Sequence, residues 1–404
     1  MKRVYICTSI LLMVFTTICA QQTVDISVQN NSKTDRKAAP IVVQLAKYGK
    51  VGSALVTRDG KEIPCQLDDL NGDGTFDELC FTTDIEKRGK LNFHIEMNEN
   101  GVPRNYEPKV YAEMLLTNKK ITASNKQNLY ISGLTTDRDV NPYWMLHHHG
   151  PAFESELVAY RIYFDHRQTV DIYGKNHKGL ELQRTQFYPD KNQKAAGLGD
   201  DILWVGETFG LGTLRGWDGS SPTMIGDVEH RTEKIVARGP VRTVIEIIDQ
   251  DWKPGKDDTP VDMTTRYTLY AGHRDCSVDI KFSHTVASYK FATGLINVKN
   301  STEYSDKKGL RGCWGTDWPV SEKDSAGYKQ ETVGLGICIP QSFVSNELQA
   351  NKDNYPFVIS TNTNSLRYAI VFGSNNEDFG YHSAKEWFNY LKNWKEELDN
   401  PVTY

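Results

Sequence analysis

The sequence has none of the short motifs that identify several common enzyme classes. It contains no nucleophile elbow, no phosphate-binding loop, no dinucleotide-binding glycine fingerprint and no H-E-x-x-H motif. Each of these motifs holds a reactive side chain or a phosphate group on a defined turn or helix. Their absence argues against a triad hydrolase, a kinase and a zincin, and we expect no organic cofactor.

Cysteine pairs and excess positive charge are also missing. No C-x-x-C pair occurs, so we expect neither a cysteine zinc site nor dithiol redox chemistry. Lysine and arginine number 47 against 52 aspartates and glutamates, which gives a net charge of −5. An acidic surface repels phosphate backbones and anionic lipids, which disfavours nucleic acid and anionic membranes as partners.

Only the N-terminus carries a long apolar run. It reads MKRVYICTSILLMVFTTICAQQ, with a basic start, an apolar stretch over residues 4–18 and the small residue Ala20. This pattern is typical of a secretory signal peptide, and no later stretch is apolar enough to span a bilayer. We therefore expect a periplasmic or secreted protein without membrane insertion, whose mature chain starts near Gln21.

Cleavage at that point leaves five cysteines, and an odd number leaves at least one thiol free in a compartment that permits disulfides. Cys65 and Cys80 lie at equal distances from the N-G-D-G turn at 71–74. A disulfide across a hairpin is one interpretation of this spacing, and two free thiols are the other.

Alternating apolar and polar residues dominate the remaining chain. This period-2 pattern is typical of strands, and turn residues separate its segments. Strand–helix alternation, the sign of a parallel α/β sheet, is missing, so the predicted fold class is all-β, a sandwich or a barrel. The single predicted strands are 24–30, 39–48, 90–97, 109–116, 156–165, 169–175, 334–340 and 366–373. Two further segments each predict a pair of strands: 233–249, broken by Gly239-Pro240, and 266–284, with a turn at A-G-H-R-D.

One segment, 383–398, has the pattern of a helix, because Trp387, Leu391 and Trp394 recur on one side. A polar stretch at 98–108 separates two groups of predicted strands. We predict three parts: a signal peptide at 1–20, a small N-terminal β-unit at 21–108 and a larger sandwich at 109–404.

The segment DLNGDGTFDE at 69–78 resembles the start of a calcium-binding loop. Calcium prefers several oxygen ligands at short spacing, and a glycine permits the sharp turn that collects them. The match is imperfect, because Cys80 stands where an EF-hand has a bidentate glutamate. Structural Ca²⁺ and a plain polar turn are both open. The candidate ligands are Asp69, Asn71, Asp73, Thr75 and Asp77.

The segment HHHGPAFESELVAYRIYFD at 147–165 places three histidines before a predicted strand. Gly150-Pro151 predicts a turn beside Glu154, and an imidazole next to a carboxylate is a general acid/base pair. Arg161 lies on a largely apolar strand, where it suits bidentate capture of a carboxylate. An internal ion pair for Arg161 and an ordinary polar loop for the histidines are the alternatives. The candidate catalytic residues are His148, His149, Glu154, Tyr160 and Arg161.

Tryptophan is concentrated in two glycine-containing segments, 199–222 and 311–322, which we interpret as loops. Flat indole rings stack on sugars, and nearby carboxylates bind hydroxyl groups. Tryptophans that merely fill loop cores are the alternative for each one singly. The candidate substrate-binding residues are Trp217, His230, His284, Trp314, Asp317 and Trp318.

HHHGPAFESELVAYRIYFD, the later RGPVRTVIEIID and the RGCWGTDWP segment resemble an uncharacterised family of secreted bacterial proteins. That family, a domain of unknown function, is grouped with galactose-mutarotase-like β-supersandwich domains. The resemblance spans about residues 25–395 and implies an antiparallel β-supersandwich with a small N-terminal β-unit and a C-terminal helix. Its members tend to be encoded beside enzymes that degrade pectin and other uronate glycans. Supersandwich enzymes use His, Tyr, Glu and Arg in one cleft, which is an analogy at the level of the fold.

The leading hypothesis is a carbohydrate-active enzyme that acts on uronate-containing, pectin-like glycans by acid/base chemistry. Lyase, glycosidase and epimerase reactions all need a proton donor and acceptor across a sugar ring, and Arg161 would neutralise the uronate carboxylate. A non-catalytic glycan-binding protein of a polysaccharide-utilisation system is the alternative, and a structural subunit is a third. The sequence sets neither the linkage nor the oligomeric state.

Overall fold

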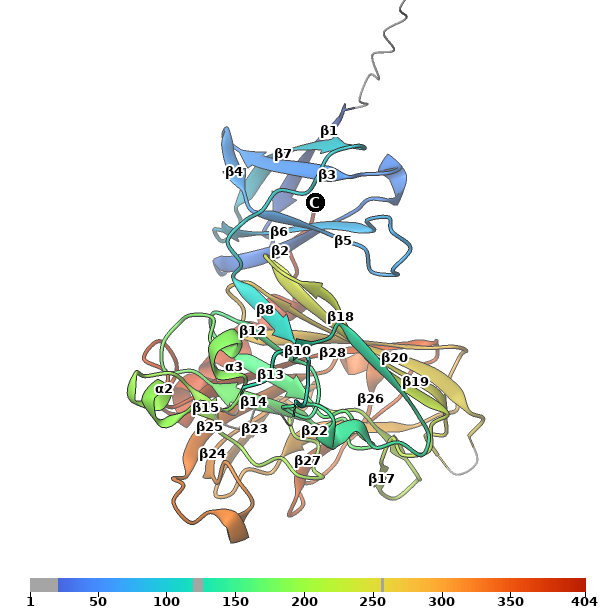
Figure 1. The fold of residues 1–404 in the computed structure, drawn as a ribbon, viewed down its shortest axis with the longest axis vertical. Helices are drawn as coiled ribbons and strands as arrows, with labels where there is room; N and C mark the ends of the chain where they lie inside the picture. The colour runs from blue at the N-terminus through green and yellow to red at the C-terminus, as the bar shows by residue number, and fades with distance from the viewer. Residues whose placement is uncertain (1–20, 119–125, 256–257) are drawn as a thin grey trace, which may run out of the picture.

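The computed structural model describes residues 21–118, 126–255 and 258–404. Figure 1 shows two β-units, with the N-terminal strands stacked on a larger body of antiparallel sheets. The all-β sandwich predicted from the period-2 pattern is confirmed. The predicted signal peptide lies outside the described residues. None of the helices in the described part is long and apolar enough to cross a membrane.

The N-terminal unit consists of two small sheets around a core of its own. Apolar residues alternate along its strands, so that Phe93, Ile95 and Met97 are buried between the sheets. One sheet has the order β1 (Gln21–Gln29), β7 (Lys90–Asn98), β3 (Ser53–Arg58), β4 (Lys61–Ile63). The other has the order β2 (Arg36–Gln44), β6 (Glu78–Ile85), β5 (Cys65–Asp68). A short 3₁₀ helix, η1 (Ala46–Tyr48), follows β2.

The main sheet of the larger body is antiparallel and has nine strands. Its order is β11 (Gly133–Asp137), β18 (His230–Arg238), β19 (Arg242–Trp252), β20 (Val261–Tyr270), β21 (Asp275–Phe282), β28 (Ser365–Ser374), β25 (Glu331–Cys338), β24 (Leu310–Asp317), β23 (Thr302–Ser305). The WGTDW segment therefore ends a strand, β24, which corrects the prediction that it is a loop. Cross-strand pairing with β25 along its whole length fixes that conformation.

Two five-stranded sheets cover the inner face of the nine-stranded sheet. The first has the order β15 (Asp200–Asp201), β14 (Val170–Gly174), β13 (Ala159–Ile162), β12 (Ala152–Ser155), β8 (Val110–Glu113). The second has the order β17 (Pro222–Thr223), β16 (Arg215–Trp217), β22 (Phe291–Ile296), β27 (Asn354–Ile359), β26 (Val344–Glu347). The remaining elements are β9 (Leu115–Leu116), β10 (Leu129–Tyr130), α1 (Leu182–Thr185), α2 (Lys191–Ala195), η2 (Pro142–Trp144), η3 (Glu322–Asp324) and η4 (Gln341–Phe343).

The main core lies between these sheets. Ile245, Ile247 and Tyr267 project from the nine-stranded sheet and pack with Phe153 and Phe291 from the two five-stranded sheets. Residues at the alternate positions, such as Glu246 on β19, project from the opposite, outer face. The outer face is therefore where this sheet presents polar side chains.

Helix α3 (Ala384–Asp399) covers one end of the outer face and confirms the predicted C-terminal helix. Ser383 caps its N-terminus by accepting the N–H of Glu386. Trp387, Leu391 and Trp394 are buried against the sheet. Glycine permits the close approach, because a Cβ at Gly312 would lie 2.2 Å from Leu391.

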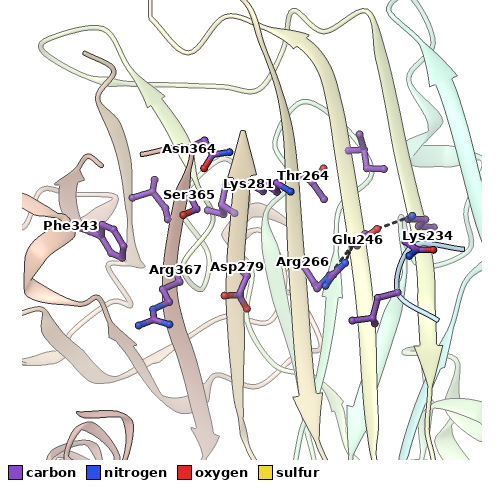
Figure 2. A pocket seen from close by; sticks show the side chains of 15 residues that line it. Lys234, Glu246, Thr264, Arg266, Asp279, Lys281, Phe343, Asn364, Ser365 and Arg367 are labelled. Carbon is purple, nitrogen blue, oxygen red and sulfur yellow. Dashed lines mark hydrogen bonds and ion pairs between the residues drawn. The ribbon is translucent and has the colours of Figure 1, made fainter. Parts of the chain in front are cut away.

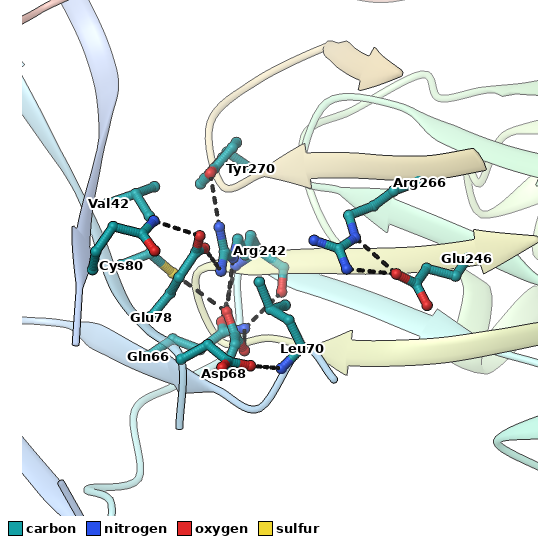
Figure 3. A network of polar contacts seen from close by, with 12 residues as sticks. Val42, Gln66, Asp68, Leu70, Glu78, Cys80, Arg242, Glu246, Arg266 and Tyr270 are labelled. Carbon is teal, nitrogen blue, oxygen red and sulfur yellow. Dashed lines mark hydrogen bonds and ion pairs between the residues drawn. The ribbon is translucent and has the colours of Figure 1, made fainter. Parts of the chain in front are cut away.

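The N-terminal unit docks on the same outer face. Figure 3 shows Arg242 of β19 at the centre of this contact. Its guanidinium donates to Asp68 at 2.7 Å and to Glu78 at 2.6 Å, and it also donates to the Tyr270 hydroxyl at 3.1 Å. The C-terminus returns to this unit, where Thr403 pairs with Gln29. Since α3 and the N-terminal unit occupy one end of the outer face, the other end is left open.

The five cysteines in the described part are all buried and free. Across the β5–β6 pair, Cys65 stands opposite Phe81, whereas Cys80 stands opposite Gln66. The two cysteines are therefore one residue out of register and project to opposite faces of the sheet. This register excludes the hairpin disulfide and leaves the alternative of two free thiols.

Candidate functional site

The calcium-like loop connects β5 to β6 and is held by its own hydrogen bonds. Asp69 accepts the backbone N–H groups of Gly72, Asp73 and Gly74 at 2.7 to 3.2 Å. Asp77 accepts the N–H of Leu70 at 2.7 Å. Nowhere in the described ranges are three or more His, Cys, Asp or Glu side chains gathered so that they could hold a metal ion. The geometry is that of a polar turn, and calcium binding stays a prediction.

Glu154 does not face a cleft, contrary to the expectation. Within the predicted strand 156–165, only Ala159–Ile162 (β13) is a strand, and it forms a hairpin with β12 (Ala152–Ser155), which carries Glu154. Its carboxylate accepts from Lys175 Nζ at 2.5 Å and from the backbone N–H groups of Glu181 and Leu182 at 2.8 to 2.9 Å. Neither side chain of the Glu154–Lys175 pair has any exposed surface. The pair fixes α1 and its flanking loop to the sheet.

Arg161 is likewise bonded within the protein. Its guanidinium donates to Asp171 at 2.6 and 2.9 Å, to Asp201 at 2.7 Å and to the Tyr188 hydroxyl at 2.7 Å. Only 5% of the side chain is exposed. A buried charge requires such partners, and here they come from the protein itself. Arg161 therefore forms an internal ion pair, which was the alternative interpretation. Its guanidinium is not free to bind a substrate carboxylate.

Two of the three histidines, His148 and His149, have different surroundings. His148 is fully buried between the Gly150 carbonyl at 2.8 Å and Glu113 at 3.3 Å. His149 has a left-handed backbone with φ of 68° and stacks on the ring of Tyr143 at 3.8 Å. Burial lowers the pKa of His149 to about 4, so its ring is neutral near pH 7 and donates Nδ1–H to the Tyr143 carbonyl.

Tyr160 also has an internal role. It is fully buried, and its hydroxyl donates to the Arg274 carbonyl at 2.5 Å. Burial raises its pKa well above the ordinary value. The predicted catalytic group therefore does not converge on one solvent-accessible cleft. The catalytic roles given to its members stay predictions.

The tryptophan-rich segments meet at a different place. Trp204, which follows β15, and Trp318, which follows β24, line one cavity of about 610 Å³. The backbone N–H of Trp204 donates to the backbone carbonyl of Trp318 at 2.9 Å, which ties the two segments together. Trp204 is 47% exposed. The volume lies within the range of known small-molecule sites, about 300–1,000 Å³.

Some polar side chains that line this cavity form hydrogen bonds or ion pairs, and others do not. Asp317 accepts the N–H groups of Trp318 at 2.8 Å and Lys299 at 3.1 Å, so it fixes the backbone at the cavity. Lys299 Nζ is paired with Glu322 at 2.6 Å. Glu207 is exposed and has no hydrogen-bond or ion-pair partner among the described residues. The cavity thus offers an unengaged carboxylate beside an exposed indole.

Four other predicted binding residues do not line the tryptophan cavity. Trp314 points to the other side of β24 and packs against Trp387 of α3, with ring centroids 6.4 Å apart. Trp217 lies half-buried on β16. His230 pairs with Asp137 at 2.9 Å, and His284 contacts the Tyr289 hydroxyl at 3.2 Å. The sequence indicated Asp317 and Trp318 but missed Glu207, whose solvent exposure no local motif reveals.

A second, larger cavity of about 810 Å³ lies on the open end of the outer face of the nine-stranded sheet. Figure 2 shows charged side chains that project from neighbouring strands, with Phe343 at one edge and Lys234 at the other. Leu70 and Asn71 of the calcium-like loop also line it. The charged residues of each strand can be read from the sequence. The strand register that brings them together cannot. We call this cavity the sheet groove, and it shares no lining residue with the tryptophan cavity.

The sheets define an antiparallel β-sandwich protein whose surface cavities include the tryptophan cavity and the sheet groove. The chain belongs to a family described as a domain of unknown function, DUF4861, whose model matches residues 28–403. The resemblance to an uncharacterised family is confirmed. No curated protein matches the chain.

The solved structures that are similar to the chain include two from Enterococcus faecalis. One is a protein in glycosyl hydrolase family 38 from Enterococcus faecalis, with a TM-score of 0.48, 8% identity and coverage of 94% of this chain and 47% of that one. The other is an alpha-mannosidase from Enterococcus faecalis V583, with a TM-score of 0.47, 9% identity and coverage of 94% and 45%. The chain spans about half the length of these two proteins.

Proposed function

We propose that this protein is a periplasmic or secreted carbohydrate-active protein and that the tryptophan cavity holds the sugar. The observation that carries the proposal is the meeting of Trp204 and Trp318, from segments far apart in the sequence, at one cavity with a carboxylate rim. An indole presents a flat apolar face to the C–H side of a sugar ring, and carboxylates and amides bind its hydroxyl groups. Three acidic residues line the cavity beside Asp317: Glu207, Glu322 and Asp353.

In the enzyme form of the proposal, Glu207 exchanges a proton with the bound sugar. It is exposed and has no hydrogen-bond or ion-pair partner in the described part, so its oxygens are free to reach a bound sugar. Asp353 is the second carboxylate, because its one ion-pair contact in the described part is a loose one, 3.9 Å from Lys352. Two carboxyl groups are what glycoside hydrolysis requires. Trp204 and Trp318 hold the ring, and Asp317 keeps the loop in place.

The glycan class that we propose is uronate-containing, on the family resemblance given above. A non-catalytic glycan-binding protein is the second candidate. It is favoured by the internal bonding of Glu154 and Arg161, which removes the predicted acid/base and clamp residues from solvent. Both candidates place the sugar in the same cavity, so one set of variants tests them together.

The test is binding and turnover on a panel of pectic, other uronate and neutral oligosaccharides. Trp204→Ala and Trp318→Ala are each expected to weaken binding by about tenfold or more, because an aromatic stacking platform contributes on the order of 1–3 kcal/mol in comparable sites. Trp144→Ala is the matched control, since Trp144 is 76% exposed and lies outside the cavity. Wild-type affinity in both cavity variants contradicts the proposal.

Glu207→Gln separates the two candidates. In the enzyme it lowers turnover by about 10²–10⁴-fold while it spares binding, because only the proton transfer is lost. Ultraviolet absorbance of unsaturated products and the release of reducing ends distinguish a lyase from a glycosidase. Binding without any turnover across the panel identifies the glycan-binding protein.

A further inference from the structure

The sheet groove contains a row of charges that crosses five adjacent strands. In register, Lys234 on β18 stands opposite Glu246 on β19, Glu246 opposite Arg266 on β20, Arg266 opposite Asp279 on β21, and Asp279 opposite Arg367 on β28. Charges of opposite sign therefore alternate along one line. Side chains directly opposite each other on one face of a sheet are near neighbours, so the row forms the floor of the groove.

Ion pairs join the row at one end only. Glu246 accepts from Lys234 at 2.8 Å and from Arg266 at 2.5 Å, and Figure 2 shows both contacts. At the other end, Arg367 stands opposite Asp279, whose pKa its charge lowers, but it forms no hydrogen bond or ion pair within the described residues. Lys281, which pairs in register with Ser365 next to Arg367, is also without such a partner in that part of the chain. Two cations on adjacent strands are thus left with unused donors.

The groove is cationic although the protein is acidic. Its lining contains four cations, Lys234, Arg266, Lys281 and Arg367, and two carboxylates, Glu246 and Asp279, whereas the whole chain has a net charge of −5. Burial raises the pKa of Asp279, and the charges of Arg367 and Arg266 oppose that shift. A concave surface of one sign within a molecule of the other sign concentrates ligands of the opposite charge.

The neighbours of the two free cations suit a polyhydroxylated ligand. Thr264, Asn364 and Ser365 supply hydroxyl and amide groups, and Phe343 supplies an aromatic face at the edge of the groove. A guanidinium beside an ammonium favours a planar carboxylate, which the guanidinium binds through two parallel hydrogen bonds. We infer that the open end of the sheet groove, with Arg367 and Lys281, is a binding site for the carboxylate of an acidic sugar unit. The inference needs no contribution from the tryptophan cavity, although it agrees with the uronate class proposed above.

The experiment titrates the full protein with a galacturonate trisaccharide and with its methyl ester, which has the same length but no charge. The acid is expected to bind roughly tenfold or more tightly than the ester, and Arg367→Gln and Lys281→Gln are each expected to remove about that factor, since hydrogen bonds to charged groups are of that strength. Added salt weakens binding of the acid more than that of the ester. Lys308→Gln, which removes an exposed cation outside the groove, is the matched control.

Both substituted side chains are exposed, and a melting curve establishes that each variant is folded. A sulfated trisaccharide forms a parallel arm. If it binds more tightly than the galacturonate trisaccharide through the same two residues, the carboxylate assignment is overturned and the ligand is a sulfate ester. Equal affinity for the acid and the ester, or wild-type affinity in both variants, overturns the inference. Trp318→Ala is measured alongside: its effect bears on the tryptophan cavity alone, so the failure of one site is distinguishable from the failure of the other.

Discussion

Glu233 projects from β18 into the core, where both of its carboxyl oxygens are buried without a hydrogen-bond partner in the described structure. Burial raises its pKa well above the ordinary value, and Arg231 opposes the shift. A Cβ at Gly150 would lie 3.2 Å from its Oε2, so the histidine segment crosses directly over this side chain. An acid in such a site is neutral until the pH rises far above the range of an exposed carboxyl.

The raised pKa of Glu233 makes the free energy of unfolding depend on pH. Because burial raises the folded pKa of Glu233 above the unfolded value near 4.5, its contribution to stability is intact below about pH 4.5 and is lost progressively as the pH rises towards the folded value. Glu233→Met is expected to raise the free energy of unfolding at pH 7 by roughly 1–3 kcal/mol, because it removes a buried carboxyl group whose ionisation the fold opposes. The gain should shrink towards pH 4.5. Urea unfolding at several pH values measures it, with exposed Glu229→Gln as control; an equal effect at every pH contradicts the account.

Single residues also show which features can be predicted from the sequence and which cannot. It predicted that a charge on the strand of Arg161 needs a partner, but it did not say that Asp171 and Asp201 supply one, because cross-strand register is a tertiary property. It predicted a turn at Gly150, whereas the constraint is close approach to the Ile162 carbonyl, 1.7 Å from a Cβ there. Reactive side-chain types were visible in the sequence, and their solvent exposure was not.

At the scale of elements, the loop at 69–77 lies between the two carboxylates that hold Arg242, Asp68 at one end and Glu78 at the other. Its backbone N–H groups already satisfy Asp69. These hydrogen bonds hold the turn in its conformation, so calcium would bind the oxygens that remain exposed. The element itself was predicted from its glycines and asparagine, because turn residues act locally.

Calcium binding to this loop would stabilise the folded state by mass action. We expect calcium to raise the melting temperature, with a stabilisation of about 2.7 kcal/mol once the free ion exceeds its dissociation constant a hundredfold. A chelator should reverse the effect, and Asp73→Ala should abolish it. Asp139→Ala, in another exposed loop, is the control. Identical melting curves with calcium and with chelator would contradict calcium binding to this loop.

Elements with a strong local pattern were predicted best. The helix was recognisable because its apolar positions repeat within one segment and Ser383 precedes it. Strand β24 was missed, since its glycines suggested a loop, whereas Gly312 makes room for Leu391 of α3. Of the candidate site, Asp317 and Trp318 were found from composition, but their meeting with Trp204 depends on long-range packing.

At the scale of the whole molecule, His273 joins the two β-units. It lies between β20 and β21, donates to the Ala38 carbonyl at 2.9 Å and pairs with Asp275 at 2.9 Å. Both ring nitrogens donate only in the protonated ring. Burial lowers the pKa of His273, but Asp275 and the Ala38 carbonyl outweigh it and raise the pKa to about 9.

This contact weakens on the alkaline side. The folded pKa is above the unfolded one, so the stabilisation is complete below about pH 6.5 and is lost as the pH rises through about 9. We expect the docking of the N-terminal unit to lose on the order of 1–3 kcal/mol over that range. His273→Gln should flatten the dependence, whereas exposed His177→Gln should not. Hydrogen exchange of β2 amides at pH 6 and pH 9.5 checks it, and unchanged protection contradicts it.

The claim that the tryptophan cavity binds carbohydrate is tested most directly by a crystal structure with the oligosaccharide that binds most tightly in the panel. The account predicts a sugar ring in contact with Trp204 and Trp318, with a hydroxyl group within hydrogen-bond distance of Glu207. A tightly bound oligosaccharide that leaves this cavity empty and occupies another surface of the protein would contradict it.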